Sequence, residues 1–417
     1  MTSAGGVGTQ EVNGVIGSSR IIWLLAVASF INYVDRGNLA TAAPLLQGEL
    51  SLTNTQLGLL MSAFFWTYIP GQFPAGWLTE RLGTRYVLGA AVALWGLATA
   101  LTGLVHSFAL LLVLRVLLGI GESALYPATC VVLAQQLPDN RRGAANGAVA
   151  SSLMFGPSFG VLLGGLVMAA IGWRPVFVAF GVLTLLWLWP WLRTDQQGPG
   201  SDKKELEDAP SLKALLRQRN FWGTCVGHFA LAYALYQVMS WLPLYLVRVH
   251  GMSVATMAKF GGLCYLMAGL ASIAAGQVAD SMTRRGARET LVRKVTLAGG
   301  LLGVAACMVG LSWAGATGAL VAMIACSMCL GIILSAYSAV VQVMAGAQVA
   351  GRWMGLASGL ANIAGVIGPI ITGALVDRTG SFTASFLIAA VVASLGALGY
   401  AVIMGRVEPI RWTRTSG

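Results

Sequence analysis

The feature that most constrains this chain is a series of long apolar segments separated by short polar loops. A helix that crosses a bilayer needs about 20 apolar residues. Twelve segments meet this requirement: 21–43, 55–78, 86–105, 108–136, 143–170, 175–192, 221–247, 254–278, 292–313, 317–345, 353–376 and 382–405. Only 10% of the residues are charged, against about 25% in a soluble domain. The sequence therefore predicts an all-α polytopic membrane protein whose surface contacts the lipid bilayer.

The distribution of positive charge predicts the orientation of these segments. The chain carries a formal net charge of +11, a value that could also indicate nucleic-acid binding. With both termini in the cytoplasm, however, 20 of the 26 Lys and Arg residues fall on the cytoplasmic side and four on the other side. Short cytoplasmic loops of membrane proteins show this excess. We therefore expect cytoplasmic termini and no nucleic-acid partner.

The longest polar stretch, residues 193–220, divides the chain into two halves of six predicted spans. We expect an N-terminal six-helix bundle over 20–192, a cytoplasmic linker over 193–220 and a C-terminal six-helix bundle over 221–405. We expect a disordered cytoplasmic tail at 1–19 and a second cytoplasmic tail at 406–417. Glycines recur at a spacing of 208 residues: Gly147, Gly160 and Gly165 match Gly355, Gly368 and Gly373. Two parallel repeats of this kind are typical of transporters, which bind their substrate between the repeats.

Four charged residues lie inside the predicted spans, where charge is costly and usually functional. Asp35 and Arg36 lie in the first span, and Arg115 and Glu122 lie in the fourth. Arg115 and Glu122 are seven residues apart, so they project from nearly the same face of a helix. The four formal charges sum to zero. The alternative to a functional site is a structural role as two buried ion pairs that lock the N-terminal half.

The motifs around these residues resemble those of a known family. Residues 32–38, Asn-Tyr-Val-Asp-Arg-Gly-Asn, look like the first-helix signature of the anion:cation symporter branch of the major facilitator superfamily. Residues 76–85 are similar to the loop 2–3 motif of that superfamily, with Glu80 where Asp is usual. Residues 115–121 and 138–143 resemble its span-four and loop 4–5 motifs. The resemblance extends from about residue 20 to 405 and implies two pseudo-symmetric six-helix bundles.

The resemblance also implies roles for individual residues. In sugar-acid members of the family the arginine at the position of Arg36 holds the substrate carboxylate, and acids at the positions of Asp35 and Glu122 take part in proton coupling. The other implied substrate-binding residues are Arg115, Tyr68, His228, Tyr337 and Asn362. The implied cytoplasmic gate consists of Gly76, Glu80, Arg81, Gly83 and Arg85. His228 and Leu153 stand where galactonate-type members have glutamine, and Leu153 argues against a heavily hydroxylated substrate.

The chemistry of these side chains agrees with the resemblance. A guanidinium group offers paired donors that match a carboxylate, and it stays charged when buried. A carboxyl group removed from water can carry a proton near neutral pH. One proton per monoanion would make symport electroneutral, whereas two would carry net positive charge inward. We favour two, with Glu122 as the first proton carrier and Asp35 as the second.

These observations predict a proton-coupled symporter that takes up a small organic carboxylate by alternating access. We expect it to act as a monomer in a bacterial inner membrane, with protons as coupling ions and no cofactor. An exporter of drugs or metabolites and a non-transporting solute sensor are the alternatives. The chain has no phosphate-binding lysine loop and no plausible Ser/His/acid set, and Cys326 and Cys329 have no nearby metal ligands, so we expect neither an enzyme nor a metal site. Sugar acids, aromatic acids, short hydroxy acids and sulfonated acids all remain open, as does Na⁺ in place of H⁺.

Overall fold

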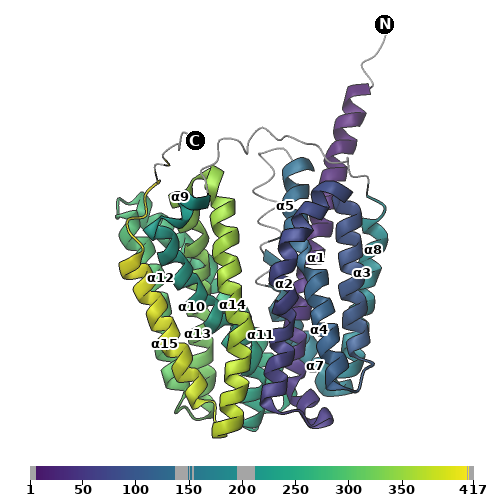
Figure 1. Ribbon diagram of the computed structural model, residues 1–417, viewed down its shortest axis with the longest axis vertical. Helices are drawn as coiled ribbons and strands as arrows, with labels where there is room; N and C mark the ends of the chain where they lie inside the picture. The colour runs from purple at the N-terminus through teal and green to yellow at the C-terminus, as the bar shows by residue number, and fades with distance from the viewer. Residues whose placement is uncertain are drawn as a thin grey trace. The chain divides into compact units, whose positions relative to one another are not determined.

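The computed structural model describes residues 6–136, 149, 151–152, 155–194, 212–410 and 412, and within these ranges it contains helices and no strand (Figure 1). The first half of the chain forms α1 (Gly6–Leu50), α2 (Asn54–Leu82), α3 (Thr84–Thr102), α4 (Phe108–Ser123), α5 (Leu125–Gln136), η1 (Gly160–Gly164), α7 (Gly165–Ile171) and α8 (Trp173–Trp191). The second half forms α9 (Leu212–Leu216), α10 (Arg219–Arg248), α11 (Val254–Arg284), α12 (Glu289–Leu311), α13 (Ala316–Ala345), α14 (Ala347–Thr379), α15 (Thr383–Leu398) and η3 (Gly399–Ile403).

The helices of the described residues match the predicted spans. Nine of them are long and apolar enough to cross a membrane, counting Phe108–Leu133 as one span. The first two predicted spans correspond to α1 and α2, which carry charged residues and interior prolines. The apolar helix Phe155–Ile171 covers most of the described part of the fifth span. The prediction of an all-α protein with twelve spans is therefore confirmed.

The structure departs from the prediction at the N-terminus. We expected a disordered tail over residues 1–19, but α1 already begins at Gly6. This segment contains no proline, and residues added to an existing helix avoid the cost of forming a new first turn. The long membrane helix that follows can therefore extend backward through a sequence with weak helical preference. In the predicted linker, the described residues include the short helix α9.

The chain forms two compact units. The N-terminal unit comprises Met1–Leu39 and Trp66–Ser201, and the C-terminal unit comprises Ala40–Phe65 and Asp202–Gly417. Within the N-terminal unit α3 packs against α4 and α8, and within the C-terminal unit α10 packs against α14 and α15 while α11 packs against α13. The segment Ala40–Phe65, which we had placed in the N-terminal bundle, contains the end of α1 and the start of α2. Its assignment to the C-terminal unit reflects its packing on α14.

Small residues of the fifth span determine where the signature segment of α1 lies. A Cβ atom added to Gly156 would lie 2.6 Å from Cβ of Tyr33, and one on Gly160 would lie 2.8 Å from the carbonyl oxygen of Val34. Glycine at such positions lets two membrane helices approach closely. The close contact holds the Tyr33–Asn38 turn of α1 against its neighbour.

Candidate functional site

Asp35 lies in the middle of α1 and is held by neutral hydrogen-bond donors. Its side chain is almost fully buried, since the residue is 2% exposed. Nε1 of Trp95 donates to Oδ2 over 3.0 Å, and Oγ1 of Thr99 donates to the same oxygen over 3.3 Å. Nδ2 of Asn38 donates to Oδ1 over 3.4 Å. These three neutral donors satisfy both oxygens of the carboxyl group.

Arg36 pairs with Glu122 instead of with its sequence neighbour. Nε of Arg36 donates to Oε2 of Glu122 over 3.0 Å, and the side chains are 14% and 0% exposed, respectively. The guanidinium carbon also lies 4.5 Å from the ring centre of Tyr68 and 5.2 Å from that of Tyr33. Successive residues of a helix point about 100° apart, which explains why Asp35 and Arg36 have different partners. Tyr68, an implied substrate-binding residue, thus lies beside the charged cluster.

Arg115 completes the charged cluster of the N-terminal unit. It lies on α4 with Glu122 and is 7% exposed. Its charge interacts with those of Glu122, Asp35 and Arg36. Two arginines and two acids therefore share one buried region, as their positions in the first and fourth spans predicted. Because an isolated buried charge is costly, a change in the charge of one member alters the free energy of charging the others.

The three predicted residues of the C-terminal unit, His228, Tyr337 and Asn362, each have an aromatic partner. The imidazole of His228 stacks on the ring of Tyr337, with ring centres 3.9 Å apart and planes 3° from parallel. The hydroxyl of Tyr236 donates to Oδ1 of Asn362 over 2.5 Å. Phe65 packs edge-on against Tyr236 at 4.7 Å between ring centres. The structure thus brings His228 to Tyr337 and gives Asn362 a tyrosine partner.

The predicted gate loop joins α2 to α3 through Gly83, whose φ of +85° favours glycine. The guanidinium carbon of Arg81 lies 4.4 Å from the ring centre of Trp77. Arg85 donates to the carbonyl oxygen of Leu192 at the end of α8. A Cβ on Gly76 would lie 3.9 Å from Cβ of Pro127, so glycine is not required there for close packing. The side chain of Glu80, residue Leu153 and the loop 4–5 motif at 138–143 lie outside the described part of the structure.

Comparison with known proteins establishes the family. The sequence family described as Major Facilitator Superfamily matches residues 25–356. The chain belongs to the major facilitator superfamily. It is similar to the hexuronate transporter of Bacillus subtilis, with 30% identity over 91% of this chain and 94% of the relative. It is also similar to a probable sulfoacetate transporter of Cupriavidus necator, with 29% identity over 91% and 92%, and to the D-galactonate transporter of Escherichia coli, with 27% identity over 93% and 95%.

A solved structure shows the same fold. A bacterial homologue of the human lysosomal transporter Spinster, in an inward-facing and occupied conformation, superposes with a TM-score of 0.79. Its sequence is 20% identical over 93% of this chain and 96% of the Spinster homologue. The chain is thus a multi-pass membrane transporter of the superfamily and not an enzyme, and its relatives are transporters of organic anions.

Two hydrogen-bond donors to the charged cluster were not predicted from the sequence. Trp95 and Thr99 of α3 bind Asp35 and are 0% and 3% exposed. The signal was their spacing, because hydrogen-bonding side chains four residues apart on one predicted span share a helix face. Their partner lies about sixty positions away in the chain, so the sequence alone did not connect them to Asp35.

The gate role of the α2–α3 loop remains a prediction. If Glu80, Arg81 and Arg85 stabilise the outward-facing state, Glu80→Ala should shift the balance toward the inward-facing state and leave intrinsic substrate affinity nearly unchanged. Labelling of cysteines placed at the cytoplasmic ends of the spans should therefore be faster in Glu80→Ala. Arg193→Gln is the control, because Arg193 is an exposed cation that stacks on Trp189. Equal labelling rates in Glu80→Ala and the parent would show that the loop only anchors the topology.

Proposed function

We propose that this transporter imports a small organic carboxylate together with protons by alternating access. The single observation that carries the proposal is the buried ion pair between Arg36 and Glu122. It places a guanidinium group suited to a carboxylate in direct contact with an acid that can accept a proton. The named substrates of the similar transporters, hexuronate, galactonate and sulfoacetate, are all anions.

Coupling follows from competition for one guanidinium group. The carboxylate of an incoming substrate displaces Glu122 from Arg36 and forms the stronger paired interaction. Glu122 is then a buried carboxylate without its cation, a state that costs several kcal/mol and is relieved by protonation. Substrate binding thereby loads a proton, and substrate release restores the ion pair. This exchange leaves the net charge of the cluster nearly constant.

Asp35 is the proposed second proton carrier. Its donors Trp95, Thr99 and Asn38 are neutral, so they can hold the carboxyl group in either protonation state. With both acids protonated, a monoanionic substrate enters with two protons and the cycle carries one net positive charge inward. The membrane potential would then add to the pH gradient as a driving force.

Within the C-terminal unit, the residues with implied substrate-binding roles offer suitable groups. Asn362 with Tyr236 and His228 with Tyr337 supply hydrogen-bonding groups and flat aromatic surfaces. Such groups suit the hydroxyl or sulfonate substituents of a small acid. The positive-inside distribution of Lys and Arg supports cytoplasmic termini in a bacterial inner membrane.

Transport by purified protein in liposomes tests the proposal. We expect labelled glucuronate, galactonate or sulfoacetate to accumulate when the outside is made acidic, and a protonophore to abolish this accumulation. Glucose is the matched control, since it lacks the carboxylate. Uptake driven by a Na⁺ gradient at uniform pH would contradict proton coupling, and failure of every acid to move would contradict carboxylate transport.

A further inference from the structure

The start of α2 is capped by an acidic side chain from a distant helix. The first amide groups of any helix lack partners within that helix. In α2, the amides of Asn54 and Thr55 donate to Oδ1 and Oδ2 of Asp377 over 3.0 and 2.7 Å. The side chains of the same two residues donate to the same two oxygens, over 2.8 and 2.5 Å. One carboxylate at the end of α14 therefore accepts four hydrogen bonds from α2.

The rest of the first turn of α2 is satisfied locally. The amide of Gln56 donates to Oγ1 of Thr53 over 3.1 Å, and the amide of Thr53 donates to Oε1 of Gln56 over 3.0 Å. This reciprocal pair is a capping box. The amide of Leu57 bonds to the carbonyl oxygen of Thr53 over 3.0 Å. Since Thr53 already caps the helix, α2 does not require Asp377 for its own stability.

Below the cap, α2 and α14 are in close backbone contact. A Cβ atom on Gly58 would overlap the carbonyl oxygen of Pro369, and one on Gly373 would overlap that of Asn54. Oγ of Ser62, a fully buried residue, donates to the carbonyl oxygen of Val366 over 2.8 Å. We call this α2–α14 contact, from Asn54 to Ser62 on one side and Val366 to Asp377 on the other, the seam. Glycine at these positions lets the two helix backbones approach closely.

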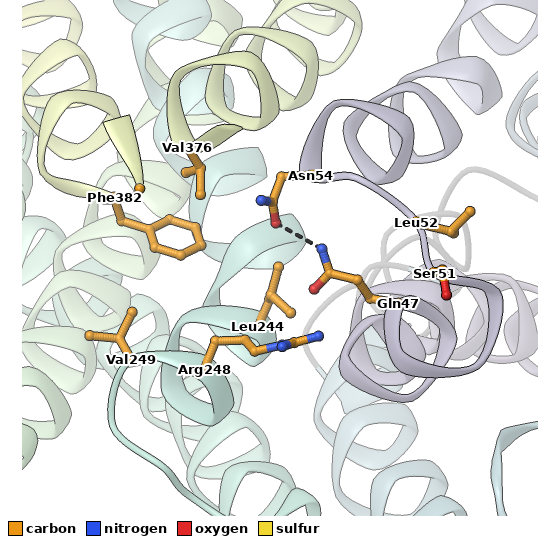
Figure 2. Close-up of a pocket in the computed structure, with 10 residues that line it drawn as sticks. Gln47, Ser51, Leu52, Asn54, Leu244, Arg248, Val249, Val376 and Phe382 are labelled. Atoms are coloured by element: carbon orange, nitrogen blue, oxygen red, sulfur yellow. Dashed lines mark hydrogen bonds between the residues drawn. The ribbon is translucent and has the colours of Figure 1, made fainter. Parts of the chain in front are cut away.

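A cavity of about 420 Å³ opens beside the cap within the same compact unit (Figure 2). Gln47 of α1 lines it and donates from Nε2 to Oδ1 of Asn54 over 2.9 Å, as the dashed line in Figure 2 shows. Arg248 of α10 and Phe382 before α15 also line it. Asn54 thus links the end of α1 to Asp377, and this end of the C-terminal unit is joined by polar contacts that water can replace.

The segment around Asp377 repeats the spacing of the predicted cytoplasmic gate motif. In Gly76-x-x-x-Glu80-Arg81-x-Gly83 an acid and an arginine precede a glycine with φ of +85°. In Gly373-x-x-x-Asp377-Arg378-x-Gly380 the same residue types precede a glycine with φ of +67°. The first motif ends α2 at the predicted cytoplasmic side, and the second ends α14 at the opposite side.

We propose that Asp377 is a latch that holds the seam between α2 and α14 closed on the outer face of the transporter. The inference rests on the proposed orientation, which places residues 50–54 and 377–383 outside the cell. Entry of a substrate from outside then requires the carboxylate to leave the first turn of α2. Thr53 keeps that turn capped while the seam is open, so opening leaves no amide of Gln56 or Leu57 without a partner. Asp377 acts on the transport cycle as a positioning residue and does not contact substrate.

Labelling of a cysteine buried in the seam tests the latch directly. Ser62→Cys, in a chain whose six native cysteines are replaced, would be exposed to a membrane-impermeant maleimide added outside intact cells. Because hydrogen bonds to a charged acceptor are lost, we expect Asp377→Asn to raise the labelling rate by about fivefold or more. Asp377→Glu should restore much of the protection. Arg378→Gln is the matched control, because Arg378 is the exposed neighbouring residue.

A second variant separates the latch from the seam. Gly373→Val should open the seam, because the new side chain would overlap the backbone of Asn54. The labelling rate of Ser62→Cys should therefore rise in this variant even if Asp377 has no latch role. Faster labelling in Gly373→Val with no change in Asp377→Asn would overturn the latch, as would equal labelling in Asp377→Asn and Arg378→Gln. The measurement needs no substrate. If the labelling rates change as expected but the protein transports no carboxylate in liposomes, the latch proposal is supported and only the proposed function is contradicted.

Discussion

Replacing Arg36 with alanine is expected to abolish uptake of the organic anion. The change removes the group that holds the substrate carboxylate and leaves Glu122, whose side chain is 0% exposed, without its cation. Breaking a buried ion pair from one side costs about 3–5 kcal/mol. Arg36→Lys should also fail, because an ammonium group cannot form the paired contact of a guanidinium. The measurement is initial uptake of labelled carboxylate into liposomes under an inward pH gradient.

The double variant Arg36→Ala/Glu122→Gln distinguishes a lost binding site from a misfolded protein. Removing both charges relieves the unpaired carboxylate, so thermal stability should return toward that of the parent while uptake stays absent. Arg174→Lys is the matched control, since Arg174 binds carbonyl oxygens of Gly103 and Val105 in a loop. Normal uptake and affinity in Arg36→Lys would contradict the proposal that the guanidinium group of Arg36 holds the substrate carboxylate by a paired contact.

The spans and the charged cluster were predictable because the bilayer imposes strong rules. Apolar segments of sufficient length must be helices, since no water is available to their backbone groups. Charges within such segments must find partners, so Asp35, Arg36, Arg115 and Glu122 were expected in one region. Successive helical residues point about 100° apart, so Asp35 need not pair with Arg36, and the structure places their partners on different helices.

The identity of the partners was less accessible from the sequence. Trp95 and Thr99 contact Asp35 only because α3 packs beside α1 at one particular height. No periodicity within a single span encodes that register between helices. Similarly, Arg36 pairs with Glu122, 86 positions away in the chain. The sequence indicated the set of four charged residues but not which of them form this pair.

The sequence did not identify Asp377 as a functional residue, for a physical reason. A carboxylate at the end of a span is usually a solvated group, and the residue is exposed in the structure. The role that we propose for it depends on its contact with the first turn of α2, more than 300 positions earlier. The same contact explains why Ala40–Phe65 belongs to the C-terminal unit although a span count assigns it to the N-terminal bundle. The repeated glycine-acid-arginine-glycine spacing was the available signal.

Glu122→Gln should uncouple transport from the proton gradient while preserving substrate movement. The amide oxygen can still accept a hydrogen bond from Nε of Arg36, so the geometry of the pair can persist without the charge. A glutamine cannot take up or release a proton and therefore resembles the protonated acid permanently. The variant should exchange labelled for unlabelled carboxylate across the liposome membrane, yet fail to concentrate it when the outside is acidic.

The matched control is Glu289→Gln, because Glu289 also faces an arginine, Arg293, at 3.6 Å but lies in α12 away from the cluster. It should concentrate substrate like the parent.

Current measurements then decide how many protons move with each substrate. An inward positive current with a monoanionic substrate indicates two protons, and an electroneutral cycle indicates one. In an electrogenic parent, loss of both current and accumulation in Glu122→Gln would show that loading of the proton proposed for Asp35 also depends on Glu122. If Glu122→Gln still concentrates substrate against its gradient, Glu122 is not the required carrier. Asp35, buried in α1 next to Arg36 and bound by neutral donors, would then couple transport on its own.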